Sequence, residues 1–98
     1  MSRIFIAVNS RGPRWDPSRP LEGQAGWDAH AAFMDGLTAQ GLVVLGGPLE
    51  GTPDALLVIR GESREQVAER LATDPWRGDG TLILRQLSPW QIRLGSLP

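Results

Sequence analysis

The chain of 98 residues contains no cysteine, no lysine and only one histidine. Without cysteine it forms no disulfide, no thiolate nucleophile and no cysteine-based zinc or iron–sulfur site. Without lysine it forms no Schiff base with a carbonyl substrate. One histidine excludes a histidine cluster within one chain, so we expect neither a cofactor nor a dedicated metal site. An adventitious metal beside the histidine and nearby acids remains open.

Strong net charge and long apolar runs are also absent. The formal net charge is −1, and the ten basic residues, all of them arginine, are spread along the chain. This distribution gives no basic surface for nucleic acid. No apolar run approaches the ~18–20 residues of a membrane-spanning helix, and residues 3–8 are too few for the apolar region of a signal peptide. We therefore expect a cytoplasmic protein with no membrane or nucleic-acid partner.

The length and the order of patterns predict one domain, residues 1–98, of the α+β class. Four strands are expected, at residues 3–9, 42–45 (continuing into 46–48), 55–60 and 81–87. A first helix is expected at residues 27–40, stopped by Gly41, and a second between its N-cap Ser63 and Asp74. The order β-α-β-β-α-β is the ferredoxin-like arrangement. Residues 10–26 form a long loop, and residues 91–98 form a C-terminal tail.

The first strand is apolar on both of its faces. Phe5 and Ala7 point to one side, and Ile4, Ile6 and Val8 point to the other. Helices cover only one face of a ferredoxin-like sheet, so a second layer must cover the other face. A homodimer formed through the open sheet face is therefore expected.

The first helix carries the single histidine on the side that faces the core. Counted from Trp27, the positions at helical spacing are His30, Ala31, Met34 and Leu37. A buried imidazole must find hydrogen-bond partners, because an unpaired buried polar group costs about 1–3 kcal/mol. The partner of His30 is therefore the first question for the tertiary structure.

The loop of residues 10–26 contains three prolines and three glycines, which deny it regular structure. It also carries Arg11, Arg14 and Trp15. One interpretation is a lid that offers guanidinium and indole groups to an anionic or aromatic ligand. The other is a solvated surface loop with Trp15 packed against the body of the protein.

Topology places the partner of His30. Short right-handed crossovers bring the start of the first helix and the end of the second to the same end of the molecule. His30 and Asp74 then become neighbours, close to Gly46, Gly47 and Pro48. A carboxylate beside an imidazole fixes its tautomer and stabilises its charged form, and glycines let backbone or ligand approach closely. The convergence predicts a cleft with a proton carrier.

Simpler readings of the same residues stay open. A histidine and an aspartate at a helix end can form a purely structural hydrogen bond. The Gly46-Gly47-Pro48 segment can be a bulge where the strand leaves the sheet. Trp27, Trp76 and Trp90 can be core or interface anchors.

Together these motifs resemble the YCII-like domain family. The resemblance rests on His30 in the first helix, Gly41 with Gly47-Pro48 after it, Asp74-Pro75-Trp76 after the second helix, and Pro89-Trp90 after the last strand. It implies a dimeric α+β barrel with a cleft in each subunit, in which His30 and Asp74 match the family's His and Asp. Some members of the family act on chlorinated or hydroxylated aromatic breakdown products.

Two functions follow, and the sequence does not choose between them. The first is a lyase or isomerase in which His30 and Asp74 are catalytic. Its substrate would contact Gly46, Gly47, Pro48, Arg11, Arg14, Trp15 and Trp76. The second is a non-catalytic dimer that binds a metabolite in the same cleft. A purely structural module is favoured only if Trp15 or Trp76 fills that cleft.

Overall fold

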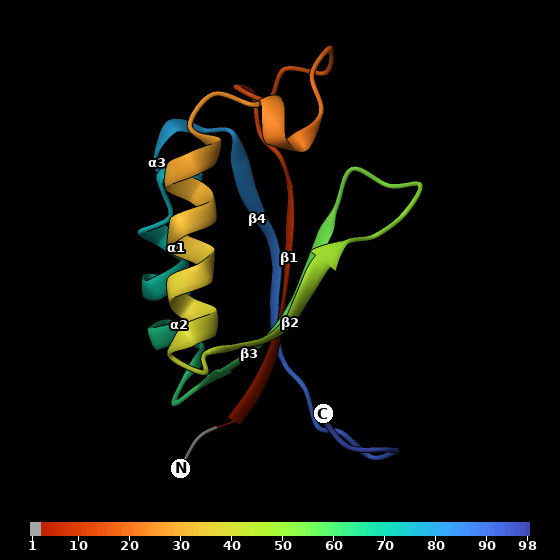
Figure 1. Ribbon diagram of the computed structural model, residues 1–98. Helices are drawn as coiled ribbons and strands as arrows, with labels where there is room; N and C mark the ends of the chain where they lie inside the picture. Colours follow the sequence, from red (N-terminus) through yellow and green to blue (C-terminus); the bar gives the residue numbers. More distant parts are fainter. Residues whose placement is uncertain (1–2) are drawn as a thin grey trace.

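The computed structural model describes residues 3–98 and shows a four-stranded sheet with helices on one face (Figure 1). The strands are β1 (Arg3–Arg11), β2 (Val43–Pro48), β3 (Ala55–Gly61) and β4 (Leu82–Pro89). The helices are α1 (Trp27–Ala39), α2 (Arg64–Ala72), α3 (Pro75–Asp79) and the short 3-10 helix η1 (Leu21–Gly23). All neighbouring strands are antiparallel, in the order β2-β3-β1-β4. The ferredoxin-like fold expected from the sequence is confirmed.

Helix α3 is the one helix of more than three residues that the sequence pattern did not predict. The Asp74-Pro75 pair predicts the end of a helix, because proline disfavours helical geometry in the residue before it. Asp74 does leave α2, but its side chain then accepts a hydrogen bond from the backbone N–H of Trp76, at 2.9 Å, and caps α3. Pro75 occupies the first turn of α3, where its missing N–H costs nothing.

Helix α2 begins as predicted, with a small difference in its capping. Ser63 is the N-cap, and its hydroxyl accepts from the backbone N–H of Gln66 at 3.1 Å. The side chain of Gln66 returns to the backbone N–H of Glu62, at 2.7 Å, one residue before the position that a capping box uses. The expected stop of α1 is also present, since Gly41 has φ +78° directly after the C-cap.

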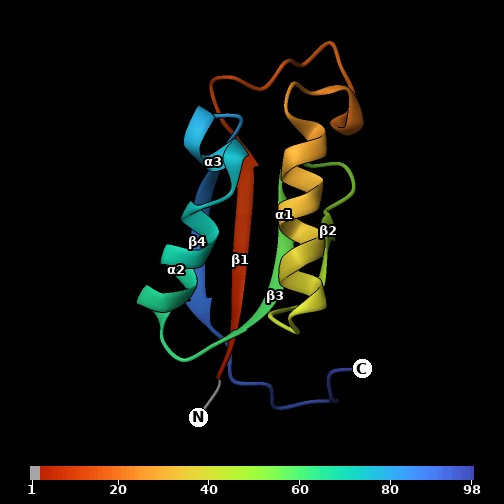
Figure 2. The same ribbon diagram turned by 60° about the vertical axis from the view of Figure 1, so that its left-hand side comes forward.

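The core lies between the sheet and the two longer helices, which lie side by side in Figure 2. Phe5 and Ala7 of β1 are fully buried against this layer, together with Leu37 of α1 and Val67 and Leu71 of α2. The sequence assigned both faces of β1 correctly. None of the helices within residues 3–98 has the length and apolar character that crossing a membrane requires.

No helix covers the opposite face of the sheet in Figure 1. The register pairs Ile6 with Val58 and Val8 with Leu56 on this face. Leu45 and Ile83, at its two edges, are 48% and 46% exposed. The face is therefore apolar and exposed at its two edges, while Val58 between them is buried within one copy of the chain.

The β2–β3 hairpin sets the position of the site. Its tip leans away from α1, as Figure 1 shows in yellow-green. A bulge in the β2–β3 pairing lies between Val43 and Leu45, and bulges increase the local bend and twist of a strand. Room for a cavity is thus left between the hairpin, the start of α1 and the loop that follows β1.

Candidate functional site

His30 and Asp74 lie 44 residues apart in the chain and form a direct contact. The Nδ1 atom of His30 is 2.8 Å from Oδ2 and 3.0 Å from Oδ1 of Asp74. Their side chains are 12% and 3% exposed. His30 belongs to the second turn of α1, and Asp74 is the N-cap of α3. The helix ends thus place a carboxylate and an imidazole together in a nearly dry environment.

Trp76 holds both members of this pair. Its indole lies parallel to the imidazole of His30, with ring centroids 4.0 Å apart and 8° between the planes. Its backbone N–H donates to Asp74, and its indole N–H donates to the carbonyl of Ala25 at 2.8 Å. Trp76 is fully buried and supports His30 from behind, and it is also among the residues that line the cavity described below.

The opposite ring nitrogen of His30, Nε2, has different surroundings. Within residues 3–98, Nε2 makes no hydrogen bond, and it is not sealed from solvent. A carboxylate can only accept at Nδ1, so Nδ1 carries the proton of this contact and Nε2 is the ring nitrogen turned away from it. The free ring nitrogen of His30 therefore lies on the side of the ring away from Asp74.

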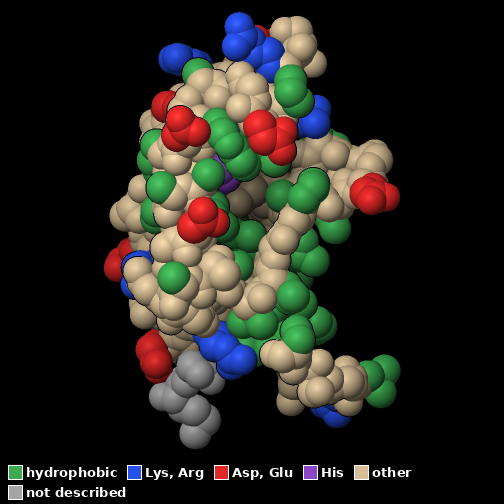
Figure 3. All heavy atoms as spheres, viewed as in Figure 1, with side chains coloured by type: hydrophobic (Ala, Val, Ile, Leu, Met, Phe, Trp, Pro, Cys, Tyr) green, Lys and Arg blue, Asp and Glu red, His purple; other side chains and the backbone are tan. Residues whose placement is uncertain are grey.

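A cavity of about 520 Å³ lies beside His30. Its walls come from α1, the β2–β3 hairpin and the loop after β1, and most of the lining residues are apolar. Figure 3 shows this hollow with hydrophobic side chains (green) around it and histidine (purple) at its back. A cavity of this size and character fits a small organic molecule.

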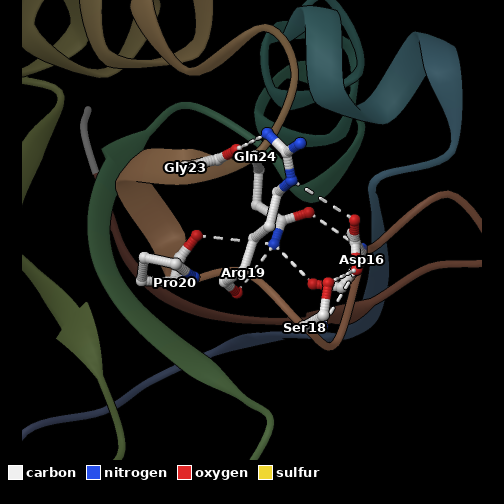
Figure 4. A network of polar contacts seen from close by, with 6 residues as sticks. All are labelled: Asp16, Ser18, Arg19, Pro20, Gly23 and Gln24. Atoms are coloured by element: carbon white, nitrogen blue, oxygen red, sulfur yellow. Dashed lines mark hydrogen bonds and ion pairs between the residues drawn. The ribbon is translucent and has the colours of Figure 1, made fainter.

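The loop after β1 is organised around Gln24, as Figure 4 shows. The buried amide of Gln24 donates to the carbonyl oxygens of Asp16 (2.7 Å) and Arg19 (3.0 Å), and it accepts from the N–H of Asp16 at 2.8 Å. The Ser18 hydroxyl and N–H donate to Asp16 and hold the pKa of that carboxyl below its ordinary value. The sequence predicts a loop without regular structure, but the segment contains the short helix η1 and is held by side-chain bonds that its composition does not reveal.

Trp15 has two kinds of neighbour in the structure. Its ring lies edge-on against Trp76, with centroids 6.1 Å apart and an interplanar angle of 80°. The same residue lines the cavity. Trp15 is thus packed against the body and forms part of the wall, while the cavity stays open.

The two predicted arginines have different surroundings. Arg11 lines the cavity, its guanidinium lies 4.8 Å from the centre of the Trp15 ring, and it has no carboxylate partner within the described residues. Arg14 does not line the cavity. Its backbone N–H donates to the carbonyl of Gly80, and its charge lies near Asp79. Arg19, outside the predicted set, also lines the cavity.

Gly46, Gly47 and Pro48 line the cavity along β2. Neither glycine has a positive φ. A Cβ at Gly47 would meet nothing within 4 Å, and one at Gly46 would meet a methyl group of Leu57 at 2.7 Å. Backbone conformation therefore does not demand glycine here; the glycines leave this wall without side chains.

Asn9 is a cavity residue that the sequence reasoning missed. It is 6% exposed, lines the cavity and follows Phe5 and Ala7 on the helix-facing side of β1. A polar residue at the third place of an otherwise apolar alternation is a signal that could have identified it.

As for metals, the described part of the chain holds no group of three or more His, Cys, Asp or Glu side chains arranged to bind one.

Comparison with known proteins gives a likeness of fold. No family model matches the chain. No curated protein matches it. Among solved structures it is similar to 5-chloro-2-hydroxyhydroquinone dehydrochlorinase (TftG) from Burkholderia phenoliruptrix AC1100, in complex with 2,5-dihydroxybenzoquinone. The TM-score is 0.56 and the identity 20%, covering 94% of this chain and 95% of that chain. The whole described architecture therefore has a counterpart of known structure.

Proposed function

We propose that the protein is a lyase or isomerase that transfers a proton on a small cyclic or aromatic metabolite, with His30 as the proton carrier. One observation carries the proposal. His30 is bound through Nδ1 to a buried carboxylate at 2.8 Å, and its Nε2 is left free beside an apolar cavity. A structural histidine would have no need of an open cavity at its second nitrogen.

The chemistry follows from this arrangement. Nε2 takes a proton from a carbon or hydroxyl group of the bound metabolite, and the imidazole becomes positively charged. Asp74 stabilises that charge and keeps the ring in one orientation. Return of the proton at another atom gives an isomerase, whereas departure of a leaving group gives a lyase. Stacking on Trp76 prevents rotation of the ring during the transfer.

Arg11 supplies the anion-binding group of the proposed site. Its guanidinium lines the cavity without a carboxylate partner among the described residues, and arginine binds planar anions through paired hydrogen bonds. Arg14 lies outside the cavity lining, so of the two arginines proposed from the sequence only Arg11 keeps this role. The two residues form a matched pair for experiment.

The similar structure supports this class of function. That protein is a dehydrochlorinase in complex with a small oxygenated ring, 2,5-dihydroxybenzoquinone. Removal of hydrogen chloride is a proton abstraction coupled to loss of a leaving group, which is the lyase form of the chemistry above. The YCII-like resemblance of the sequence, with His30 and Asp74 at its matching positions, points the same way.

We further propose that two copies of the chain pair through the open sheet face. No helix within the described residues is layered on this face, and its edge residues Leu45 and Ile83 are exposed, whereas contiguous apolar patches above ~400 Å² are unusual on soluble monomers. Trp76 is fully buried within its own subunit and cannot anchor such an interface, whereas Trp90 is 45% exposed and can. We also propose that the protein is cytoplasmic.

Proton abstraction can be measured before the natural substrate is identified. The protein is incubated in D₂O with a panel of small lactones and hydroxylated or chlorinated aromatics, and loss of carbon-bound protons is followed by ¹H NMR. We expect exchange or turnover with at least one compound. His30→Gln should abolish this exchange, because the amide of glutamine cannot act as a general base near neutral pH. Arg11→Gln should weaken the use of anionic compounds, and Arg14→Gln should not.

The same panel separates catalysis from binding alone. A compound that shifts the His30 signals but exchanges no proton would support the non-catalytic dimer. Absence of both binding and exchange across the panel would contradict the proposal.

A further inference from the structure

Asn9 occupies a position where an amide has no structural reason to be. It lies on the central strand β1, opposite Ala55 of β3 and Leu84 of β4. Its side chain is on the face that carries Phe5 and Ala7, it is 6% exposed, and it lines the cavity. Every neighbour named here is apolar.

The amide of Asn9 is unpaired. Its Oδ1 is buried without a partner, and neither polar atom of the side chain makes a hydrogen bond within residues 3–98. Buried polar groups in native proteins are nearly always hydrogen-bonded, and leaving one unpaired costs stability. Leucine, which has nearly the same shape, would avoid that cost. The amide is therefore retained at the expense of stability.

We propose that Asn9 binds a neutral oxygen substituent, a hydroxyl or carbonyl group, on the ligand of the cavity. This inference rests on the proposed function, since it concerns the same cavity. A carboxamide both donates and accepts hydrogen bonds, so it pairs with either group without introducing charge. Asn9 is thus a specificity residue for the ligand, separate from the His30–Asp74 pair that moves the proton.

Arg11 extends this recognition along the same strand. Residues two apart on a strand point to the same face and lie about 6.6 Å from each other. Asn9 is buried whereas Arg11 is exposed, and both line the cavity. A ligand that contacts both has a hydroxyl or carbonyl at its inner end and an anionic group at its outer end, joined by one small apolar ring.

A pair of probes tests this reading directly. 4-Hydroxybenzoate has both features, and 4-methylbenzoate replaces the hydroxyl by a methyl group of similar size. Asn9 is the only asparagine and His30 the only histidine in the chain, so each gives one set of side-chain NMR signals after selective ¹⁵N labelling. We expect both sets to shift along one saturation curve, with 4-hydroxybenzoate binding about five- to tenfold more tightly.

Asn9→Leu is the decisive variant. It should abolish the preference for 4-hydroxybenzoate over 4-methylbenzoate. It should also raise Tm, by about 5 °C for a domain of this size, because it removes an unpaired buried amide. Ser10→Ala is the matched control. It removes a hydroxyl from the opposite face of the same strand and should leave the preference unchanged.

Each outcome decides the inference. Equal affinity of the wild type for the two probes, with shifts at His30 but none at Asn9, would overturn it and leave the proposed function standing. A Tm that falls in Asn9→Leu would show a structural role for the amide and would also overturn it. No shift at either residue would overturn the inference together with the cavity as a ligand site. The wild-type NMR result decides the question even if Asn9→Leu does not fold.

Discussion

The imidazole of His30 lies flat on the indole of Trp76, with 4.0 Å between the ring centres and 8° between the planes. This contact joins the start of α1 to α3, and the bond from the indole N–H to Ala25 joins α3 to the residue before the N-cap of α1. One buried side chain therefore sets the orientation of the ring that we propose as the base. Its removal should affect stability and site geometry together.

Trp76→Phe tests that relationship. Phenylalanine keeps an aromatic ring in the core but loses the hydrogen bond to Ala25 and part of the stacked area. We expect a loss of about 1–3 kcal/mol in the free energy of unfolding, measured by urea denaturation. The His30 ring signals should also broaden or shift. Trp90→Phe, at an exposed position, is the control and should change the His30 signals little. An unaltered His30 spectrum in Trp76→Phe would show that the stack does not orient the imidazole.

Asp74→Asn separates the two roles of Asp74. Asparagine caps helices as well as aspartate does, so α3 should persist. The negative charge of the Asp74 carboxylate beside Nδ1 is lost, and the preference for the Nδ1–H tautomer should weaken, which ¹⁵N shifts of the single imidazole report directly. Asp74→Ala removes the cap as well, and it should lower the free energy of unfolding by about 1 kcal/mol more than Asp74→Asn does. The same tautomer population in wild type and Asp74→Asn would show that the carboxylate does not select it.

Gln24→Ala should loosen the loop that covers one end of the cavity. The amide of Gln24 makes its bonds to backbone groups of Asp16, Arg19 and Pro20. Their loss leaves those groups to water, and amide hydrogen exchange over residues 16–24 should accelerate at least tenfold. Gln40→Ala is the control, because the side chain of Gln40 is exposed and its amide oxygen accepts a hydrogen bond from the side chain of Arg70. Unchanged exchange in Gln24→Ala would mean that the loop is held elsewhere.

The open sheet face should mediate dimerisation. Light scattering is expected to give twice the chain mass for the wild type. The double substitution Leu45→Asp and Ile83→Asp should give the monomer, because dimerisation would then bury two unpaired charges from each subunit. Ala32→Asp, on the exposed side of α1, should leave the dimer intact. A wild-type monomer at micromolar concentration would contradict the proposal.

Asp79 should make the corner after α3 sensitive to acid. Its carboxylate accepts from the hydroxyl of Thr81 at 2.6 Å and from the Thr81 N–H at 2.9 Å, and these bonds, led by the hydroxyl, hold the pKa of Asp79 below its ordinary value of 3.8. A carboxyl with a lowered pKa in the folded state stabilises the fold above its unfolded value, and that contribution disappears as pH falls through the lowered value.

Asp79→Asn measures this effect, since asparagine keeps an acceptor but not the charge. The variant should be slightly less stable than the wild type at pH 7, and the difference should shrink as the pH falls below 3.8. Urea midpoints between pH 7 and pH 2 give the comparison. The effect should be small, because Asp79 is exposed to solvent. A difference that is independent of pH would contradict the assignment.

The sequence by itself determined the elements that depend on local pattern. Alternation in residues 3–9 identified both faces of β1, Ser63 marked the start of α2, and Gly41 marked the end of α1. Helical spacing turned His30 inward, and connection rules brought Asp74 to the same end. The element boundaries depend on steric and hydrogen-bonding preferences that act over a few residues, so a short window of sequence reveals them, whereas the meeting of His30 and Asp74 follows from the handedness of the connections.

Only the tertiary structure decided how the site is assembled. The Asp74-Pro75 pair is compatible both with the end of one helix and with the start of the next. In the structure Asp74 caps α3 and also contacts His30. The stack on Trp76, the role of Gln24 and the unpaired amide of Asn9 likewise depend on neighbours that the fold supplies. Their energies come from contacts between distant segments, and no local pattern encodes which side chains will meet. Short segments of sequence therefore predict the helices and strands, whereas the site depends on contacts between segments that are distant in the chain.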